Sequence, residues 1–234
     1  MKVFSWLLLL LAVLFIFCKN DKPTSPSIQS LPVNQPINSP EKEVKPIVFD
    51  YDTAIWTDIG LIDPTITLDL KYATTDNFVK EKMYDCGRCF LRPEVATLIL
   101  KAQQQLKTQG LSLKLFDCYR PKPIQEKLWA KVPNANYVTP PWKGSMHNRG
   151  AAIDLTIVDK NGVALDMGTA YDFFGKEAHH TFTAHSPKVN ANRKLLKDLM
   201  ESYDLRPIRT EWWHYSYQKK SYDISEMQWA CPNQ

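Results

Sequence analysis

Two short segments far apart in the chain hold the residues that most constrain its fold. The first contains His147 and Asp154, and the second contains Glu211 and His214. Hydrolytic zinc sites need three protein ligands, an open position for water and a separate base that takes the proton of that water. Two imidazoles and two carboxylates can meet this demand. A fold that uses them must bring the two segments together.

The two segments place geometric demands on their backbone. If residues 151–155 are extended, Ile153 faces one side of the strand and Asp154 faces the other. Glu211 and His214 would face opposite sides of a regular strand, so a turn or twist is needed to bring both to one metal. Each residue alone is ordinary, because a lone Asp or His is more often a hydrogen-bonded residue than a ligand. Three rival histidines sit in a polar loop, where solvation is the simpler interpretation: His179, His180 and His185.

The N-terminal segment has the pattern of an export signal. Lys2 precedes an apolar run from Val3 to Phe17, which is typical of a secretory signal and short for a membrane span. Cys18 follows and is a candidate for lipidation, although Phe17 is not the small residue that usually precedes a lipidated cysteine. An uncleaved anchor and a signal cut elsewhere are the alternatives. We expect residues 1–18 to direct export, to the periplasm or to the membrane.

Composition divides the rest of the chain into a tether and one domain. Residues 19–45 are rich in Pro, Ser, Asn and Lys, and they lack the apolar periodicity needed to offset the loss of chain entropy. Residues 46–234 are long enough for one domain with its own core. The formal net charge is +4, and the chain has no block of Lys or Arg. This pattern argues against a nucleic-acid partner.

Four of the five cysteines lie in the predicted domain: Cys86, Cys89, Cys118 and Cys231. Disulfides persist in exported proteins, and four cysteines allow three pairings between which the sequence does not choose. The Cys-x-x-Cys spacing of Cys86 and Cys89 is also compatible with half of a structural zinc site or with a redox motif. The sequence has no second such spacing and no thioredoxin-like surroundings. We therefore predict disulfides, with buried free thiols as the alternative.

Hydrophobic periodicity predicts an α+β fold. Apolar residues recur at helical spacing in residues 93–106, 121–129 and 195–203. Alternation predicts strands at residues 65–72, 111–119, 151–158 and 211–217, with residues 163–166 as a candidate partner of the third strand. Helices beside largely antiparallel strands indicate a single domain with a mainly antiparallel sheet flanked by helices.

The two opening segments match a known signature. The pattern Ser-x-His-x-x-Gly-x-Ala-x-Asp begins at Ser145, and Glu-x-x-His begins at Glu211; together they resemble the signature of the zinc D-alanyl-D-alanine peptidases. The resemblance extends from about Ile59 to Tyr217 and favours the VanX-type dipeptidase branch. Further segments that are similar to this branch are residues 70–74, 76–78, 88–89, 116–121, 166–169 and 172–174.

The resemblance implies a metal centre and a base. It makes His147, Asp154 and His214 the ligands of one zinc ion per chain, and it makes Glu211 the catalytic base. Two neutral imidazoles and one carboxylate leave zinc enough positive charge to lower the pKa of water from ~15.7 towards ~7. A carboxylate beside that water can take its proton and hand it to the leaving amine.

The resemblance also implies contacts to the substrate. It makes Arg120 the cation that stabilises the developing oxyanion, because an arginine keeps its charge and can donate two hydrogen bonds. Asp117 is a candidate to orient Arg120. Asp166 is implied as the partner of the substrate ammonium and Ser145 as a polar contact, although Asp166 could equally cap the turn before Gly168.

The implied activity is zinc-dependent hydrolysis of the dipeptide D-Ala-D-Ala to two D-alanines. Since residues 1–18 predict export, we expect cell-wall peptide turnover rather than glycopeptide resistance, which requires destruction of a cytoplasmic pool. A D-Ala-D-Ala carboxypeptidase acting on longer muropeptides is the nearest alternative. A zinc-containing peptidoglycan-binding module without turnover is the alternative of another class, and the presence of both Glu211 and Arg120 argues against it.

Overall fold

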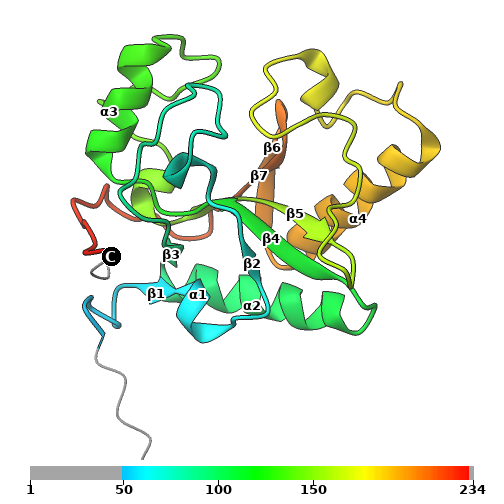
Figure 1. Ribbon diagram of the computed structural model, residues 1–234, viewed down its shortest axis with the longest axis horizontal. Coiled ribbons are helices and arrows are strands. Elements are labelled where there is room, and N and C mark those ends of the chain that lie inside the picture. Colours follow the sequence, from blue (N-terminus) through cyan, green and yellow to red (C-terminus); the bar gives the residue numbers. More distant parts are fainter. Residues whose placement is uncertain (1–48, 232–234) are drawn as a thin grey trace, which may run out of the picture. The chain divides into compact units, whose positions relative to one another are not determined.

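The computed structural model describes residues 49–231 (Figure 1). The predicted signal or anchor at residues 1–18 and the tether at residues 19–45 lie outside the described residues. Among the residues that are described, no helix combines the length and the apolar character that crossing a membrane requires.

A five-stranded sheet lies at the centre of the described domain (Figure 1). Its strands, in spatial order, are β2 (Thr67–Leu68), β4 (Ser112–Asp117), β5 (Ala152–Val158), β7 (Glu211–Tyr217) and β6 (Leu205–Ile208). β2 pairs with β4 in parallel, and the other pairs are antiparallel. A separate antiparallel pair consists of β1 (Thr57–Asp58) and β3 (Phe90–Leu91). The predicted α+β domain with a mainly antiparallel sheet is confirmed.

Four α-helices accompany the sheet in the described residues: α1 (Ile59–Ile62), α2 (Pro93–Lys107), α3 (Lys122–Lys131) and α4 (Pro187–Ser202). Short 3-10 turns occupy Lys71–Ala73, His147–Arg149 and Lys176–Ala178. Proline stands at the start of α2 and α4, where its fixed φ suits the first helical turn and its missing N–H costs nothing.

The central strand β5 separates the core from the site. Its odd-numbered side chains, Ile153, Leu155 and Ile157, belong to one buried cluster with apolar residues of α2 and α4. Asp154 is also buried, with 3% of its surface exposed, but it lies outside that cluster. Because successive side chains of a strand point to opposite faces, Asp154 projects away from the cluster that contains α2 and α4, as predicted.

Several elements differ from the predicted ones. The strand predicted at residues 65–72 has only two paired residues before the turn at Lys71–Ala73. Residues 163–166 contribute a single bridge, between Ala164 and Val158. Helix α4 begins at Pro187, well before residue 195, because the Ser186 side chain caps it by accepting a hydrogen bond from the Val189 backbone N–H. Strand β6 was not predicted.

The four cysteines of the domain form two disulfides, Cys86–Cys231 and Cys89–Cys118. The prediction of disulfides is confirmed, and the pairing that the sequence left open is resolved. Cys89 and Cys118 are fully or almost fully buried, at 0% and 1% exposure. This bridge joins the residue that directly precedes β3 to the residue that directly follows β4.

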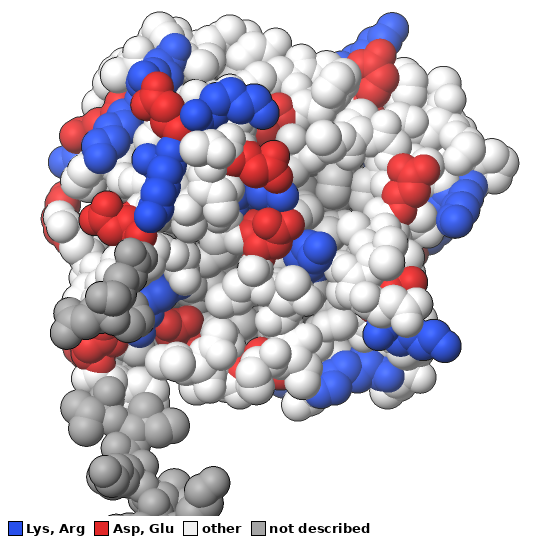
Figure 2. Space-filling view, in the orientation of Figure 1, with Lys and Arg blue, Asp and Glu red and all other residues white. Residues whose placement is uncertain are grey.

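Figure 2 shows Lys and Arg side chains interspersed with Asp and Glu over the visible face of the domain. Among the described residues on this face, charges of one sign do not gather into an extended patch. Nucleic-acid surfaces concentrate Lys and Arg on one face or along one helix. On the face that Figure 2 shows, the described residues do not form such a concentration.

Gly150→Ala is expected to destabilise the domain more than Gly110→Ala does. The φ angles are +68° and +69°, and a Cβ in this left-handed region costs about 1–2 kcal/mol. At Gly150 the Cβ would lie 2.3 Å from Cζ3 of the buried Trp56, whereas at Gly110 it would meet nothing within 4 Å. The clash with Trp56 should add about 1–3 kcal/mol. Urea unfolding measures the loss of unfolding free energy in each variant, and equal losses would contradict this prediction.

Candidate active site

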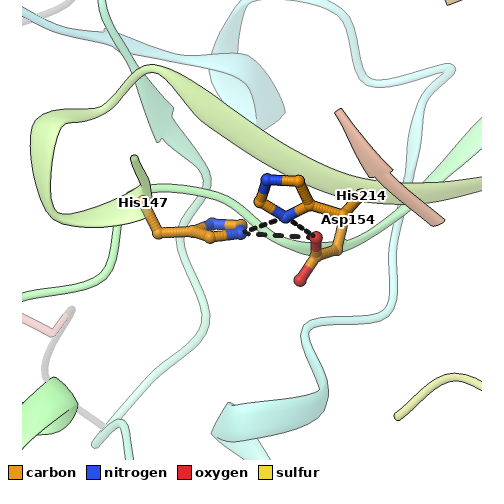
Figure 3. Close-up of side chains that lie close together, drawn as sticks. All are labelled: His147, Asp154 and His214. Atoms are coloured by element: carbon orange, nitrogen blue, oxygen red, sulfur yellow. Dashed lines mark hydrogen bonds and ion pairs between the residues drawn. The ribbon is translucent and has the colours of Figure 1, made fainter. Parts of the chain in front are cut away.

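Three side chains converge on one point, and we call them the metal triangle: His147, Asp154 and His214 (Figure 3). Nε2 of His147 lies 3.1 Å from Nδ1 of His214 and 3.3 Å from Oδ1 of Asp154. The third edge, from Nδ1 of His214 to Oδ1 of Asp154, is 3.0 Å. Ligand atoms about 2.0–2.1 Å from a tetrahedral zinc lie about 3.3 Å apart, so these three atoms have the spacing of a zinc site.

Two strands and one turn place the metal triangle. Asp154 of β5 and His214 of β7 are direct partners in the antiparallel register, so their side chains project from the same face. His147 comes from the 3-10 turn that ends at Gly150, where φ is +68°. A left-handed residue closes such a turn and leads the chain directly into β5.

An irregularity in β7 brings Glu211 to the metal triangle. Consecutive residues of β6, Pro207 and Ile208, pair with Tyr215 and Glu211, so extra residues of β7 bulge between these two pairs. The bulge places Glu211 and His214 on the same side of the strand, although a regular strand would separate them. Oε2 of Glu211 lies 4.0 Å from Nδ1 of His214. The geometric demand that the sequence raised is therefore met.

Hydrogen bonds behind the metal triangle orient its ligand atoms. Nδ1 of His147 donates to the carbonyl oxygen of Cys118 at 2.7 Å, which leaves the lone pair of Nε2 directed at the centre of the site. The Tyr171 hydroxyl donates to Oδ2 of Asp154 at 3.0 Å. Burial alone would raise the pKa of Asp154, but the facing imidazoles of His147 and His214 lower it. Three electron pairs directed at one point suit a divalent cation.

Glu211 has the properties of a proton acceptor near neutral pH. Its side chain is 20% exposed and lines the same cavity as the metal triangle. Burial raises the pKa of Glu211 to about 7, with His214 opposing this effect. A base is most effective when its pKa lies near the working pH, so this carboxyl suits proton transfer.

Arg120 is buried and held in one orientation. Its Nε and Nη2 donate to Oδ2 of Asp117 at 3.0 and 2.7 Å, and its Nη1 donates to Oε1 of Gln125 at 2.9 Å. Its guanidinium carbon lies 5.0 Å from the centre of the Tyr72 ring. Burial would lower the pKa of Arg120, but Asp117 raises it well above its usual value, so the group stays charged. The predicted orienting role of Asp117 agrees with these hydrogen bonds.

One cavity of about 200 Å³ joins these groups. The predicted site residues that line it are His147, Asp154, His214, Glu211, Arg120 and Ser145. Trp213 forms part of its wall, whereas Trp212 is buried in the core and donates to Oγ1 of Thr169 at 2.8 Å. Pockets for drug-sized ligands occupy roughly 300–1,000 Å³, so this cavity suits a smaller molecule.

The structure does not bring Asp166 to this cavity. Asp166 is exposed, and its Oδ1 accepts a hydrogen bond from the Gly168 backbone N–H at 2.8 Å. This is the turn-capping role that the sequence left open as the alternative. The expectation that Asp166 meets a substrate ammonium in the pocket is therefore corrected, because its short side chain is engaged in this turn outside the cavity.

Asp172 is the carboxylate from the same loop that does line the cavity. Its φ is +57°, a backbone conformation that turns the chain sharply after Tyr171. Its Oδ2 accepts a hydrogen bond from the Tyr72 hydroxyl at 3.2 Å. Burial and the nearby Asp154 raise the pKa of Asp172 well above its usual value. The half-buried carboxyl of Asp172 forms no ion pair with another described residue, so a ligand in the cavity can supply a cationic partner.

The three rival histidines lie elsewhere. His179, His180 and His185 are half-buried, and Nε2 of His185 bonds to the carbonyl oxygen of Glu177 at 2.8 Å. Within residues 49–231, the metal triangle is the one group of three or more potential ligands whose atoms lie within 4.8 Å of one another. None of the three rival histidines belongs to this group.

A comparison with known protein families identifies the family of this chain. The model of the peptidase M15 family, described as D-Ala-D-Ala dipeptidase, matches residues 53–231. The chain belongs to the peptidase M15 family. It is therefore a zinc metallopeptidase, and the metal triangle is the group of its described residues that fits the zinc ion. The resemblance noted in the sequence is confirmed.

Relatives in the M15 family are similar over most of their length. The D-alanyl-D-alanine dipeptidase of Escherichia coli (strain K12) is 35% identical over 181 residues, which cover 77% of this chain and 94% of the relative. The D-alanyl-D-alanine dipeptidase of Enterococcus faecium is 34% identical over 178 residues, which cover 67% of this chain and 88% of the relative. The D-alanyl-D-alanine dipeptidase of Enterococcus faecalis (strain ATCC 700802 / V583) is 32% identical over 168 residues, which cover 63% of this chain and 83% of the relative.

Sequence reasoning missed several groups that shape this M15 site. Tyr171 binds Asp154, Gln125 binds Arg120, and Tyr72 binds Asp172. Tyrosine and glutamine are common in any core or helix, so nothing in their spacing marks them. Tyr72 and Asp172 had one signal, since each lies in a segment that resembles the dipeptidase branch, but the residue type of Asp172 did not separate it from Asp166.

Proposed function

We propose that this M15 peptidase hydrolyses D-Ala-D-Ala to two molecules of D-alanine. The observation that carries the proposal is the convergence of the metal triangle, Glu211 and Arg120 on one small cavity. The relatives from E. coli and E. faecium, both named D-alanyl-D-alanine dipeptidases, support the choice of substrate.

His147, Asp154 and His214 would hold the zinc ion, beside Glu211. The ion would supply a Lewis acid that lowers the pKa of water and polarises a carbonyl oxygen. Glu211 takes a proton from the water that attacks the peptide carbonyl, and it returns a proton to the amine that leaves when the C–N bond breaks. A pKa near 7 lets one carboxyl both accept and return that proton.

Arg120 stabilises the negative charge that develops on the carbonyl oxygen. Its guanidinium lines the cavity and is oriented by Asp117 and Gln125 before substrate arrives. A donor that is already oriented needs no reorganisation as charge develops, which is where such groups contribute most. Fixing Arg120 to Asp117 and Gln125 therefore serves catalysis as well as stability.

Asp172 recognises the ammonium group of the dipeptide. Its half-buried carboxyl lines the cavity, and its pKa is raised well above the usual value by loss of solvent and by Asp154. A substrate ammonium offsets both effects, because it supplies the missing positive charge. Ser145 lines the same cavity and offers a polar contact, with its backbone N–H already bound to Oδ1 of Asn148 at 2.8 Å.

The rim of the cavity favours a dipeptide over a longer muropeptide. Tyr137 stacks on Phe174 with ring centres 4.4 Å apart, and Phe174 contacts Phe78 edge to face at 5.0 Å. All three rings line the cavity of about 200 Å³. A carboxypeptidase needs an opening for the rest of the peptide beyond the scissile bond. The aromatic rings restrict that opening.

Hydrolysis of three substrates tests the proposal. D-Ala-D-Ala, L-Ala-L-Ala and a pentapeptide that ends in D-Ala-D-Ala are each incubated with the protein, with and without a chelator. We expect release of D-alanine from the first substrate alone, and its loss on chelation. Faster release from the pentapeptide would favour the carboxypeptidase, and release from none of them would favour the binding module.

Asp172→Asn is expected to raise KM for D-Ala-D-Ala by about 10- to 100-fold, since a hydrogen bond to a charged group contributes about 1.5–3 kcal/mol. The change keeps the shape of the side chain and removes the charge that the ammonium needs. Steady-state kinetics measures the effect. Asp166→Asn is the matched control, because its carboxylate lies outside the cavity and its KM should not change. The reverse pattern would restore the assignment to Asp166.

We also propose that the reaction takes place outside the cytoplasm, in the periplasm or at a membrane, as part of cell-wall peptide turnover. Lys2 and the apolar run from Val3 to Phe17 support this location. Cell fractionation with detection of the N-terminus tests it. Protein in the cytosol with residues 1–17 retained would contradict the proposal, and a Cys18→Ser variant distinguishes lipidation from a protein anchor.

A further inference from the structure

The chain continues past β7 as an extended segment, residues 218–231, which we call the C-terminal strap. It runs beside β3 and the start of α3 (Figure 1). The Cys86–Cys231 disulfide fixes its end to the domain. The buried Tyr119 hydroxyl lies 3.0 Å from the Ser225 carbonyl oxygen and 2.8 Å from that of Met227, so it fixes the middle of the strap.

The strap is bonded to the loops that carry the site. The Ser225 backbone N–H donates to the carbonyl oxygen of Asn148 at 2.9 Å. Nδ2 of Asn148 in turn donates to the carbonyl oxygen of Arg120 at 2.7 Å. Nη1 of Arg149 donates to the carbonyl oxygen of Tyr222 at 2.6 Å. The residues next to His147 are therefore linked both to the strap and to Arg120.

Trp229 is the aromatic anchor of the strap. Its ring packs edge to face on Tyr84, with ring centres 5.4 Å apart, and lies 5.6 Å from the ring of Phe90. Its Nε1 donates to the carbonyl oxygen of Cys86 at 3.2 Å, beside the disulfide that holds the strap. An aromatic ring packed in this way restricts the position of its neighbour, and here that neighbour is Tyr84.

Tyr84 is linked to the guanidinium of Arg120 through the carboxylate of Asp117. Its hydroxyl donates to Oδ1 of Asp117 at 2.8 Å, and Oδ2 of the same carboxylate accepts from Nε and Nη2 of Arg120. Tyr84, Asp117 and Arg120 are 4%, 1% and 8% exposed, so water does not replace these bonds easily. The two carboxylate oxygens of Asp117 have different partners. Oδ1 accepts from Tyr84, and Oδ2 accepts from Arg120.

We infer that Trp229, held by the Cys86–Cys231 disulfide, positions Arg120 through Tyr84 and Asp117. The inference rests on the proposed role of Arg120 as the oxyanion donor. Trp229 and Tyr84 touch neither the metal triangle nor the cavity interior, so they act as positioning residues. A shift of about 1 Å in a group that must meet the transition state lowers the rate by about 100-fold. The strap therefore affects the rate of hydrolysis, although it contributes neither a zinc ligand nor a catalytic base.

Kinetics of strap and relay variants on D-Ala-D-Ala tests the inference. Trp229→Ala, Tyr84→Phe and the double variant Cys86→Ser/Cys231→Ser are each expected to lower kcat by about 10- to 100-fold. KM and the zinc content should stay unchanged, because none of the three changes replaces Asp172 or a member of the metal triangle. Trp229→Phe should retain most of the activity. Glu226→Gln is the matched control, since this strap residue is exposed and contacts Lys122 alone among the described ion pairs.

A double-mutant comparison shows whether the residues act in series. In a Tyr84→Phe background, Trp229→Ala should lower kcat by less than twofold further, because the path to Arg120 is already broken. Full multiplication of the two losses would overturn the inference. Unchanged kcat in all three variants would overturn it as well, and so would parallel losses of kcat and zinc, which indicate a general loss of structure.

A readout that needs no substrate separates this inference from the proposed function. The Nε–H of Arg120, buried against Asp117, should exchange slowly with solvent in ¹⁵N-arginine spectra, and Arg120→Lys identifies its signal. Tyr84→Phe and Trp229→Ala should each speed this exchange by at least about tenfold. Unaltered exchange overturns the inference. Absence of D-Ala-D-Ala hydrolysis by the unmodified protein overturns the proposed function and leaves the exchange result to decide the inference.

Discussion

Glu211→Gln is expected to lower kcat for D-Ala-D-Ala by about 10²- to 10⁴-fold, the range that a general acid–base group contributes. The amide keeps the size of the side chain, but it cannot take a proton from the attacking water. Because Glu211 lies outside the metal triangle, the zinc content should remain that of the unmodified protein. Steady-state kinetics and metal analysis of the same preparation measure both quantities.

Two results would contradict this role for Glu211. Unchanged turnover would show that another group takes the proton. Loss of zinc along with activity would show that Glu211 serves as a ligand, although its Oε2 lies 4.0 Å from Nδ1 of His214, too far to share the triangle's close spacing. A Glu201→Gln variant on α4 is a suitable control, because it removes a carboxylate of the same type away from the cavity.

His147→Ala is expected to release the metal. The remaining pair, Asp154 and His214, supplies two ligands where a catalytic zinc needs three. Loss of a group that merely orients a ligand lowers metal affinity by about 10- to 100-fold, so loss of a ligand should lower it by more than about 100-fold. Metal analysis after dialysis and titration with zinc measure the affinity, and D-Ala-D-Ala hydrolysis should disappear with the metal.

His179→Ala is the matched control for this prediction. His179 is a half-buried histidine in the same domain, and it lies outside the metal triangle. We expect one zinc per chain and unchanged hydrolysis in this variant. Retention of zinc by His147→Ala would mean that the ligand set differs from the one that the geometry defines.

The elements with strong local signals could be predicted from the sequence. Helix α2 follows from Pro93 at its start and from apolar residues at helical spacing, and β4 follows from alternation. Strand β6 has a proline at position 207 and only four residues, so its pattern is too short to stand out. Its pairing with β7 depends on tertiary contacts that periodicity does not record.

The site was predictable as a set of residue types but not as a geometry. His147, Asp154 and His214 could be named because the segments that hold them resemble the signature of the zinc D-alanyl-D-alanine peptidases. The bulge that turns Glu211 towards His214 arises from the pairing of β7 with β6, which no local pattern encodes. The choice between Asp166 and Asp172 likewise depends on which carboxylate the loop places in the cavity. The sequence therefore named candidate residues, but it did not show which of them the fold brings close together.

The Cys86–Cys231 disulfide also determines the order in which the active site can be completed. Its cysteines are 145 residues apart in sequence, whereas those of the Cys89–Cys118 bridge are 29 apart. The short bridge can close early in synthesis, beside the carbonyl that orients His147. The long bridge must wait until residue 231 has been made. A chain that stops before Cys231 can therefore hold its metal ligands while Arg120 lacks the support that we infer for it, so the site is completed only after residue 231 has been made.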